Sequence, residues 1–159
     1  MESEIGKSLT RLFEISLYAT RVNAEGITDA EALIQPRPDG NCMNWVLGHI
    51  LSSREAMLKL LGEAPVLEPE VAARYKRGSA PILGEEDGLP FSELLTALTT
   101  SQERLLRGIA NASEAKWDEA VPEFGTTKGA LHFLHFHEAY HSGQVAVLRR
   151  MAGKKGAIQ

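Results

Sequence analysis

Apolar positions along the chain recur with the spacing of helices in four long segments, and no segment alternates with the two-residue period of a strand. The segments cover about residues 3–23, 41–61, 91–110 and 126–152. The inward stripe of the first segment consists of Ile5, Leu9, Leu12, Phe13, Leu17 and Thr20. Four helices of this length predict an all-α protein built as a four-helix bundle.

Helix breakers and capping residues mark the ends of these segments. Pro36 and Pro38 precede the second segment, where Asn41 is the expected N-cap. Thr126 and Thr127 are the expected caps of the fourth segment. The boundaries therefore agree with the periodicity in predicting four long helices.

The connections between the predicted helices are long for a four-helix bundle. About 28 residues, rich in proline and glycine, separate the second helix from the third. Loops longer than ~12–15 residues usually cover a functional site or are disordered. Short helices are expected within the connections, at residues 28–33, 71–75 and 113–118. We expect the loop of residues 63–90 to shield a site in the bundle.

Composition narrows the class of protein. A chain of 159 residues fits one domain, here 1–159, and 43% hydrophobic with 24% charged residues is ordinary for a globular protein. The net charge of −4 argues against a dedicated nucleic-acid binder. No apolar run approaches the ~20 residues needed to span a membrane, and the acidic N-terminus has no signal-peptide core. A single cysteine, Cys42, excludes an internal disulfide, so a cytoplasmic protein is expected.

The segment FHEAYHSGQ, residues 136–144, contains the H-E-x-x-H letters of zinc peptidases. In such enzymes two histidines hold zinc, a glutamate acts as general base, and a third ligand follows downstream. After His141 the chain contains no Asp, Glu, His or Cys, so the peptidase interpretation fails. Glu138 stays a candidate general base, the alternative being an ordinary carboxylate beside the core-facing stripe.

Three histidines are predicted to face the bundle interior. His137 and His141 lie ~40° and ~6 Å apart on the fourth helix and interrupt its apolar stripe, and His49 is centred on the stripe of the second. His132 and His135 lie off the stripe, at a surface or an interface. Buried histidines often only bond to neighbours, but three of them are hard to satisfy without an ion. Three imidazoles with coordination positions left open are typical of catalytic metal sites.

The two histidine segments together resemble the DinB/YfiT-like metalloenzyme superfamily. NWVLGHI is followed about 90 residues later by HEAYHSGQ, and the order and spacing of the four helices agree. The matching residues are Trp45, Gly48 and His49 in the first segment and His137, His141, Gly143 and Gln144 in the second. The resemblance implies a four-helix bundle of variant up-and-down topology, usually dimeric, with a divalent ion on the three histidines. Members with assigned activities are often thiol-dependent transferases or isomerases that use low-molecular-weight bacterial thiols.

The leading functional hypothesis is a divalent-metal-dependent enzyme that acts on a small electrophilic substrate. The ion, zinc or nickel in preference to iron or copper, would lower the pKa of a bound water or of an exogenous thiol. The alternatives are a non-catalytic metal-binding module, a stress-response dimer with a structural metal, and a metal-dependent hydrolase. Arg74, Lys76 and Arg77 are candidates to hold carboxylates of a thiol, or form a solvated face. Cys42 is too far along its helix from His49, ~10 Å, to share a metal ion.

Two further apolar flanks suggest that the protein is a homodimer. They consist of Phe133, Phe136, Tyr140 and Val147 on the fourth helix and Leu47, Leu51 and Leu58 on the second. Apolar faces on two helices beyond those that the bundle covers predict burial against a second subunit. The alternative is that the long loops cover them.

Overall fold

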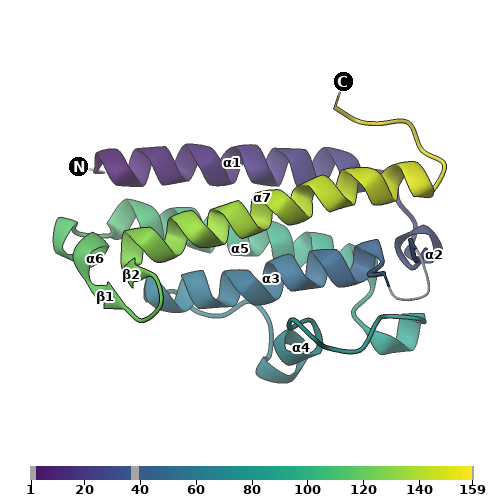
Figure 1. Ribbon diagram of the computed structural model, residues 1–159, viewed down its shortest axis with the longest axis horizontal. Helices are drawn as coiled ribbons and strands as arrows, with labels where there is room; N and C mark the ends of the chain where they lie inside the picture. Colours follow the sequence, from purple (N-terminus) through teal and green to yellow (C-terminus); the bar gives the residue numbers. More distant parts are fainter. Residues whose placement is uncertain (1–2, 37–39, 159) are drawn as a thin grey trace.

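Four long helices pack side by side (Figure 1). The structure is a computed structural model that describes residues 3–36 and 40–158. The long helices are α1 (Glu4–Ala24), α3 (Met43–Leu60), α5 (Phe91–Asn111) and α7 (Thr127–Met151). The connections hold α2 (Asp29–Ala32), α4 (Pro69–Arg74), the 3-10 helix η1 (Glu85–Asp87), α6 (Glu114–Asp118) and the strands β1 (Ala120–Val121) and β2 (Gly125–Thr126). The predicted all-α four-helix bundle is confirmed.

The helix ends follow local capping chemistry, with one correction. The side chains of Ser3 and Thr126 accept hydrogen bonds from the backbone of the first turns of α1 and α7. At α3 the N-cap is Cys42 and not Asn41, because the carbonyl of Cys42 accepts the first helical bond, from Val46. Pro38, expected before this helix, lies outside the described residues.

The small β-hairpin before α7 was not predicted. Strands β1 and β2 are antiparallel and contain two residues each, which is too short for a period-two pattern in the sequence. Glu123, at the turn, has a φ of 70°, in the left-handed region. The hairpin joins α6 to the first turn of α7.

The order of the long helices explains the longest connection. Helices α3 and α5 run in the same direction, opposite to α1 and α7, so the chain goes up, down, down and up (Figure 1). Asn44, near the start of α3, bonds to Leu89 just before α5, while Leu61 after α3 lies against Gly108 near the end of α5. Because α3 and α5 are parallel, the connection must return along the length of the bundle, and it carries α4 and η1 on its way.

The two flanks expected to form a dimer surface have different surroundings. Leu47, Leu51 and Leu58 are buried, because α3 packs against α4, α5 and α7. The prediction of an uncovered flank on α3 is therefore wrong. On α7, by contrast, the side chains of the predicted flank are 50–66% exposed: Phe133, Phe136, Tyr140 and Val147.

Among the helices of the described residues, none is long and apolar enough to cross a membrane.

Candidate metal centre

The imidazoles of His49, His137 and His141 meet between α3 and α7. The Nε2 atom of His137 lies 3.1 Å from that of His49 and 3.2 Å from that of His141. His49 and His141 are buried, and His137 is half-buried. We call these three residues the histidine centre. It brings together the three histidines that the sequence places on inward stripes of two helices.

Hydrogen bonds orient two of the three rings. His49 Nδ1 donates to the backbone carbonyl of Tyr75 at 2.7 Å, and His141 Nδ1 donates to Oε1 of Gln144 at 2.7 Å. A neutral imidazole carries one proton, so both rings have an unprotonated Nε2 whose lone pair faces the other histidines. Gln144, one of the residues of the H-x-G-Q element, thus orients a potential metal ligand.

The third ring, His137, has no hydrogen-bond partner for its Nδ1 among the described residues, although this atom is buried. Burial, together with the neighbouring His141 and His49, lowers the pKa of His137 to about 4. Burial also lowers the pKa of His49 and of His141. All three rings are therefore neutral near pH 7, which is the form that binds a metal ion.

The donor atoms fit a transition-metal ion. Two nitrogens bonded to one zinc ion at ~2.0–2.1 Å lie about 3.3 Å apart at a tetrahedral angle, close to the separations between these Nε2 atoms. Imidazole nitrogen suits zinc, nickel, iron and copper. Within residues 3–36 and 40–158 the group of potential ligands consists of these three histidines. The arrangement would leave coordination positions open, as in catalytic zinc sites.

The W-x-x-G-H element builds the support for His49. The ring of Trp45 stacks on His49 with the ring centres 4.6 Å apart, and its Nε1 donates to Ser79. A Cβ atom on Gly48 would lie 2.1 Å from the ring of Tyr75, so only glycine leaves room for this tyrosine. Tyr75 in turn presents the carbonyl that orients His49. Tyr75 was not predicted, because its contact with α3 depends on how the long connection folds back.

The connection is fixed over α3 by the Tyr75 hydroxyl. It donates to Asn44 Oδ1 at 3.1 Å and accepts from the backbone N–H of Leu89 at 2.7 Å. Asn44 Nδ2 also donates to the carbonyl of Leu89. The loop of residues 63–90 therefore lies against the histidine centre through a specific contact rather than as an unattached cover.

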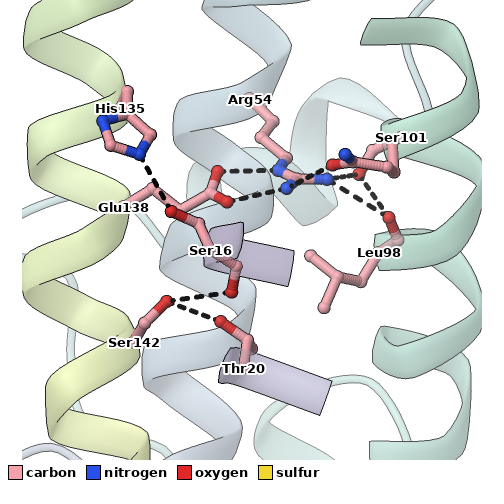
Figure 2. A network of polar contacts seen from close by, with 9 residues as sticks. Ser16, Thr20, Arg54, Leu98, Ser101, His135, Glu138 and Ser142 are labelled. Carbon is pink, nitrogen blue, oxygen red and sulfur yellow. Dashed lines mark hydrogen bonds and ion pairs between the residues drawn. The ribbon is translucent and has the colours of Figure 1, made fainter. Parts of the chain in front are cut away.

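Glu138, next to His137 in the sequence, is buried in an ion pair. Its two carboxylate oxygens accept from Nε and Nη2 of Arg54 at 2.8 and 2.7 Å, as Figure 2 shows. Glu138 is 2% exposed and Arg54 is fully buried. A carboxylate held in this way is a poor general base, and it is not an exposed flanking residue either. The pairing was not visible in the sequence, because it joins positions 84 residues apart.

The remaining candidate groups lie away from the histidine centre. Cys42 is buried, its thiol donates to the carbonyl of Ile82, and burial raises its pKa. The guanidinium of Arg74 donates to backbone carbonyls of the connection, which leaves Lys76 and Arg77 of that cluster exposed to solvent.

The two other histidines also lie apart from the centre. His132 is exposed and bonds to a carbonyl of its own helix. His135 lies between α1 and α7, where its Nε2 is 3.1 Å from the hydroxyl oxygen of Ser16. The position of His132 agrees with the expected surface location, whereas His135 is half-buried between two helices of the bundle, with its ring edge-on to Phe13.

Comparison with known proteins identifies a family. A family model described as the DinB superfamily matches residues 12–145, a span that covers most of the chain and contains all three histidines of the centre. No curated protein matches the sequence significantly.

Proposed function

The chain belongs to the DinB superfamily, and from this premise we propose that it is a divalent-metal-dependent enzyme acting on a small electrophilic substrate. The observation that carries the proposal is the convergence of three imidazoles: Nε2 of His137 lies 3.1 Å from that of His49 and 3.2 Å from that of His141, and the potential ligand atoms of all three lie within 4.8 Å of one another. A bound divalent ion supplies Lewis acidity, which lowers the pKa of water or of a thiol toward neutrality. The chain's own contribution is to hold three neutral imidazoles in place and to orient them through Tyr75 and Gln144.

A catalytic ion is favoured over a structural one. Structural zinc sites normally use four protein ligands, whereas the group of potential ligands here consists of three histidines in the described part of the chain. The half-buried position of His137 is compatible with access from solvent. Zinc and nickel are the preferred ions, and iron and copper are also compatible with imidazole ligands.

The proposed reaction is thiol-dependent transfer or isomerisation, with a low-molecular-weight thiol as cofactor. The chain's only cysteine is buried, is engaged with a backbone carbonyl and has a raised pKa, so Cys42 is unsuited to be the nucleophile. The thiol must then come from solution. A free cysteine also suits the reducing cytoplasm, where we place the protein. Metal-dependent hydrolysis, with water in place of the thiol, is the second candidate, since the same open positions serve it.

We also propose that two copies of the chain associate through α7. Phe136, Tyr140, Gly143 and Val147 follow one another at intervals of three and four residues and so share a helix face. A Cβ atom on Gly143 would meet no atom of the described residues within 4 Å, although glycine inside a helix costs about 1 kcal/mol relative to alanine. A glycine amid exposed apolar side chains allows a second helix to approach closely. Sedimentation showing a monomer at tens of micromolar would contradict this association.

Metal analysis tests the central proposal. Protein purified without a histidine tag is expected to contain a stoichiometric divalent ion, which His49→Ala, His137→Ala and His141→Ala each remove. His132→Ala is the matched control, because His132 is exposed and lies on the same helix as two ligands. A triple variant that retains the parent's metal content would refute the site.

Cobalt substitution tests the thiol. The absorption spectrum of the cobalt protein is expected to change when a low-molecular-weight thiol is added, and the same thiol is expected to support turnover of electrophilic test substrates. His49→Ala abolishes both effects. A cobalt spectrum that is indifferent to every thiol would favour water activation instead.

A further inference from the structure

A buried charged cluster lies beside the histidine centre, on the same two helices. Arg54 follows His49 by five residues on α3, and Glu138 is adjacent to His137 on α7. Neither side chain is hydrogen-bonded to an imidazole of the centre. We propose that Arg54 and Glu138 are positioning residues that hold α3 and α7 in the register that the three metal ligands require. This inference rests on the proposed function and adds to it what sets the geometry of the site.

The guanidinium of Arg54 has an acceptor for each of its five N–H groups. Nε donates to one carboxylate oxygen of Glu138 and Nη2 to the other. Nη1 donates to the Leu98 carbonyl and to the hydroxyl of Ser101, at 3.3 and 2.8 Å, and Nη2 also donates to Oε1 of Gln102 at 2.9 Å. Figure 2 shows Arg54 between Glu138 on one side and Ser101 and Leu98 on the other. We call these five residues the Arg54 cluster.

The Arg54 cluster joins three helices through directional contacts. Arg54 belongs to α3, Glu138 to α7, and Leu98, Ser101 and Gln102 to α5. The apolar contacts around it are non-directional and tolerate small shifts of one helix along another. The planar guanidinium, in contrast, requires its acceptors at fixed positions. The cluster therefore fixes both the rotation and the translation of α3 relative to α7.

In the histidine centre, α3 and α7 meet through a single polar contact, between Nε2 of His49 and Nε2 of His137, whose atoms a bound ion would take as ligands. His49 is oriented by the carbonyl of Tyr75, which lies in the connection after α4, and His141 by Gln144, on its own helix. Neither support ties α3 to α7. Metal ligation tolerates deviations of about 0.2 Å in bond length, so a small slide of α3 would separate His49 from His137 beyond what one ion can bridge. The directional contact between Arg54 and Glu138 opposes this slide.

Positioning can be separated from simple stabilisation by replacing both charges together. Apolar residues of similar volume in place of a buried ion pair often leave stability unchanged or raise it, whereas removal of one partner leaves an unpaired charge. The test variant is therefore Arg54→Met combined with Glu138→Leu. It removes the directional contacts and keeps the core filled.

In this double variant we expect a folded helical protein with an unfolding midpoint at or near that of the parent. Its zinc affinity, measured by competition with a chromogenic chelator, should fall by about tenfold or more, as for residues that support metal ligands in other sites. The visible absorption bands of the cobalt protein, which report coordination geometry, should also shift. A purely structural role would not move these bands.

Two control variants make the comparison specific. Arg107→Met with Glu63→Leu removes an ion pair that links the end of α5 to the loop after α3, with Arg107 exposed, and should leave zinc affinity at the parental value. Ile109→Ala removes buried methyl groups at the end of α5 and should lower stability without changing the cobalt spectrum. If the double variant fails to fold, Glu138→Gln is compared with Ile109→Ala under conditions of equal unfolding midpoint.

Each outcome has a separate meaning. A double variant with the zinc affinity and cobalt spectrum of the parent would overturn the positioning role and leave the proposed function intact. Loss of affinity equal to that in Ile109→Ala at matched stability would also overturn it, because stability alone would then explain the effect. A parent protein that binds neither zinc nor cobalt would instead refute the proposed function itself.

Discussion

Two polar clusters lie between α3 and α7, and they differ in which of their groups are paired. In the Arg54 cluster every N–H of the guanidinium and both oxygens of Glu138 have partners, and Nε2 of Gln102, at the edge of the cluster, is buried without one among the described residues. In the histidine centre three Nε2 atoms face one another, and Nδ1 of His137 is buried without a partner in the described part of the chain. What distinguishes the histidine centre is its set of facing imidazole nitrogens, which are metal-ligand atoms, whereas the carboxylate of Glu138 is fully engaged by Arg54. The role of the Arg54 cluster is to hold helices together.

The largest expected effect comes from removing one partner of the ion pair in the Arg54 cluster. Glu138→Ala leaves the fully buried Arg54 without its carboxylate, and removal of one partner from a buried pair costs about 3–5 kcal/mol. We expect a loss of this size in the free energy of unfolding, measured by urea denaturation followed by circular dichroism. Glu63→Ala, which removes the partner of Arg107, whose side chain is 57% exposed, is expected to cost less than about 1 kcal/mol.

Metal binding at the histidine centre should stabilise the protein. Zinc present at 100 times its dissociation constant is expected to raise the free energy of unfolding by about 2.7 kcal/mol, because the ion binds the folded chain. His49→Ala should abolish this increase, while His132→Ala should keep it. Thermal unfolding with and without added zinc provides the measurement. An equal increase in parent and His49→Ala would place the bound ion elsewhere.

Substitution of two glycines separates support of the centre from the exposed face of α7. Gly48→Ala forces a methyl group into the ring of Tyr75, so we expect a loss of about 1–3 kcal/mol in stability together with weaker zinc binding. At Gly143→Ala the new methyl group meets no neighbour in residues 3–36 and 40–158, so the folded monomer should gain up to about 1 kcal/mol and zinc binding should persist. Urea denaturation and zinc titration measure both variants. Equal effects of the two substitutions would contradict the role of Tyr75.

A further expected effect is a dependence of stability on pH in the metal-free protein. The pKa of His137 is about 4 in the folded chain and 6.5 ordinarily, so between these values the unfolded chain binds a proton that the folded chain does not. The free energy of unfolding should therefore decrease as the pH falls from 6.5 toward about 4. Denaturation of the metal-free protein across this window measures the slope, which His137→Gln should reduce. A slope unchanged by His137→Gln would assign it to other groups.

The sequence predicted those parts of the site that depend on local periodicity. His49, His137 and His141 are found on the inward faces of their helices because the stripe of apolar residues defines a face within one helix. Tyr75 and the pairing of Arg54 with Glu138 escaped prediction, because they depend on which distant segments meet. The periodicity of a single sequence does not indicate which distant segments are in contact.

The errors in the fold have the same origin. Leu47 and Leu51 form a second apolar flank of α3, and the pattern alone cannot say whether a second subunit or the chain itself covers it. Helix α3 lies against α4, α5 and α7, so the chain covers both. The exposed flank of α7 has the same appearance in the sequence. Only the packing of whole helices distinguishes them.

The hydrogen bond between His49 and the backbone of Tyr75 couples metal binding to the conformation of the long connection. When residues 63–90 adopt their ordered conformation, they favour the orientation of His49 that binds a metal ion. By reciprocity, an ion bound to His49 favours the ordered connection by the same free energy. Amide hydrogens of this segment, such as that of Leu89 on the Tyr75 hydroxyl, should therefore exchange more slowly in the metal-loaded protein. Any molecule that displaces the connection would, through the same coupling, weaken binding of the ion and promote its dissociation.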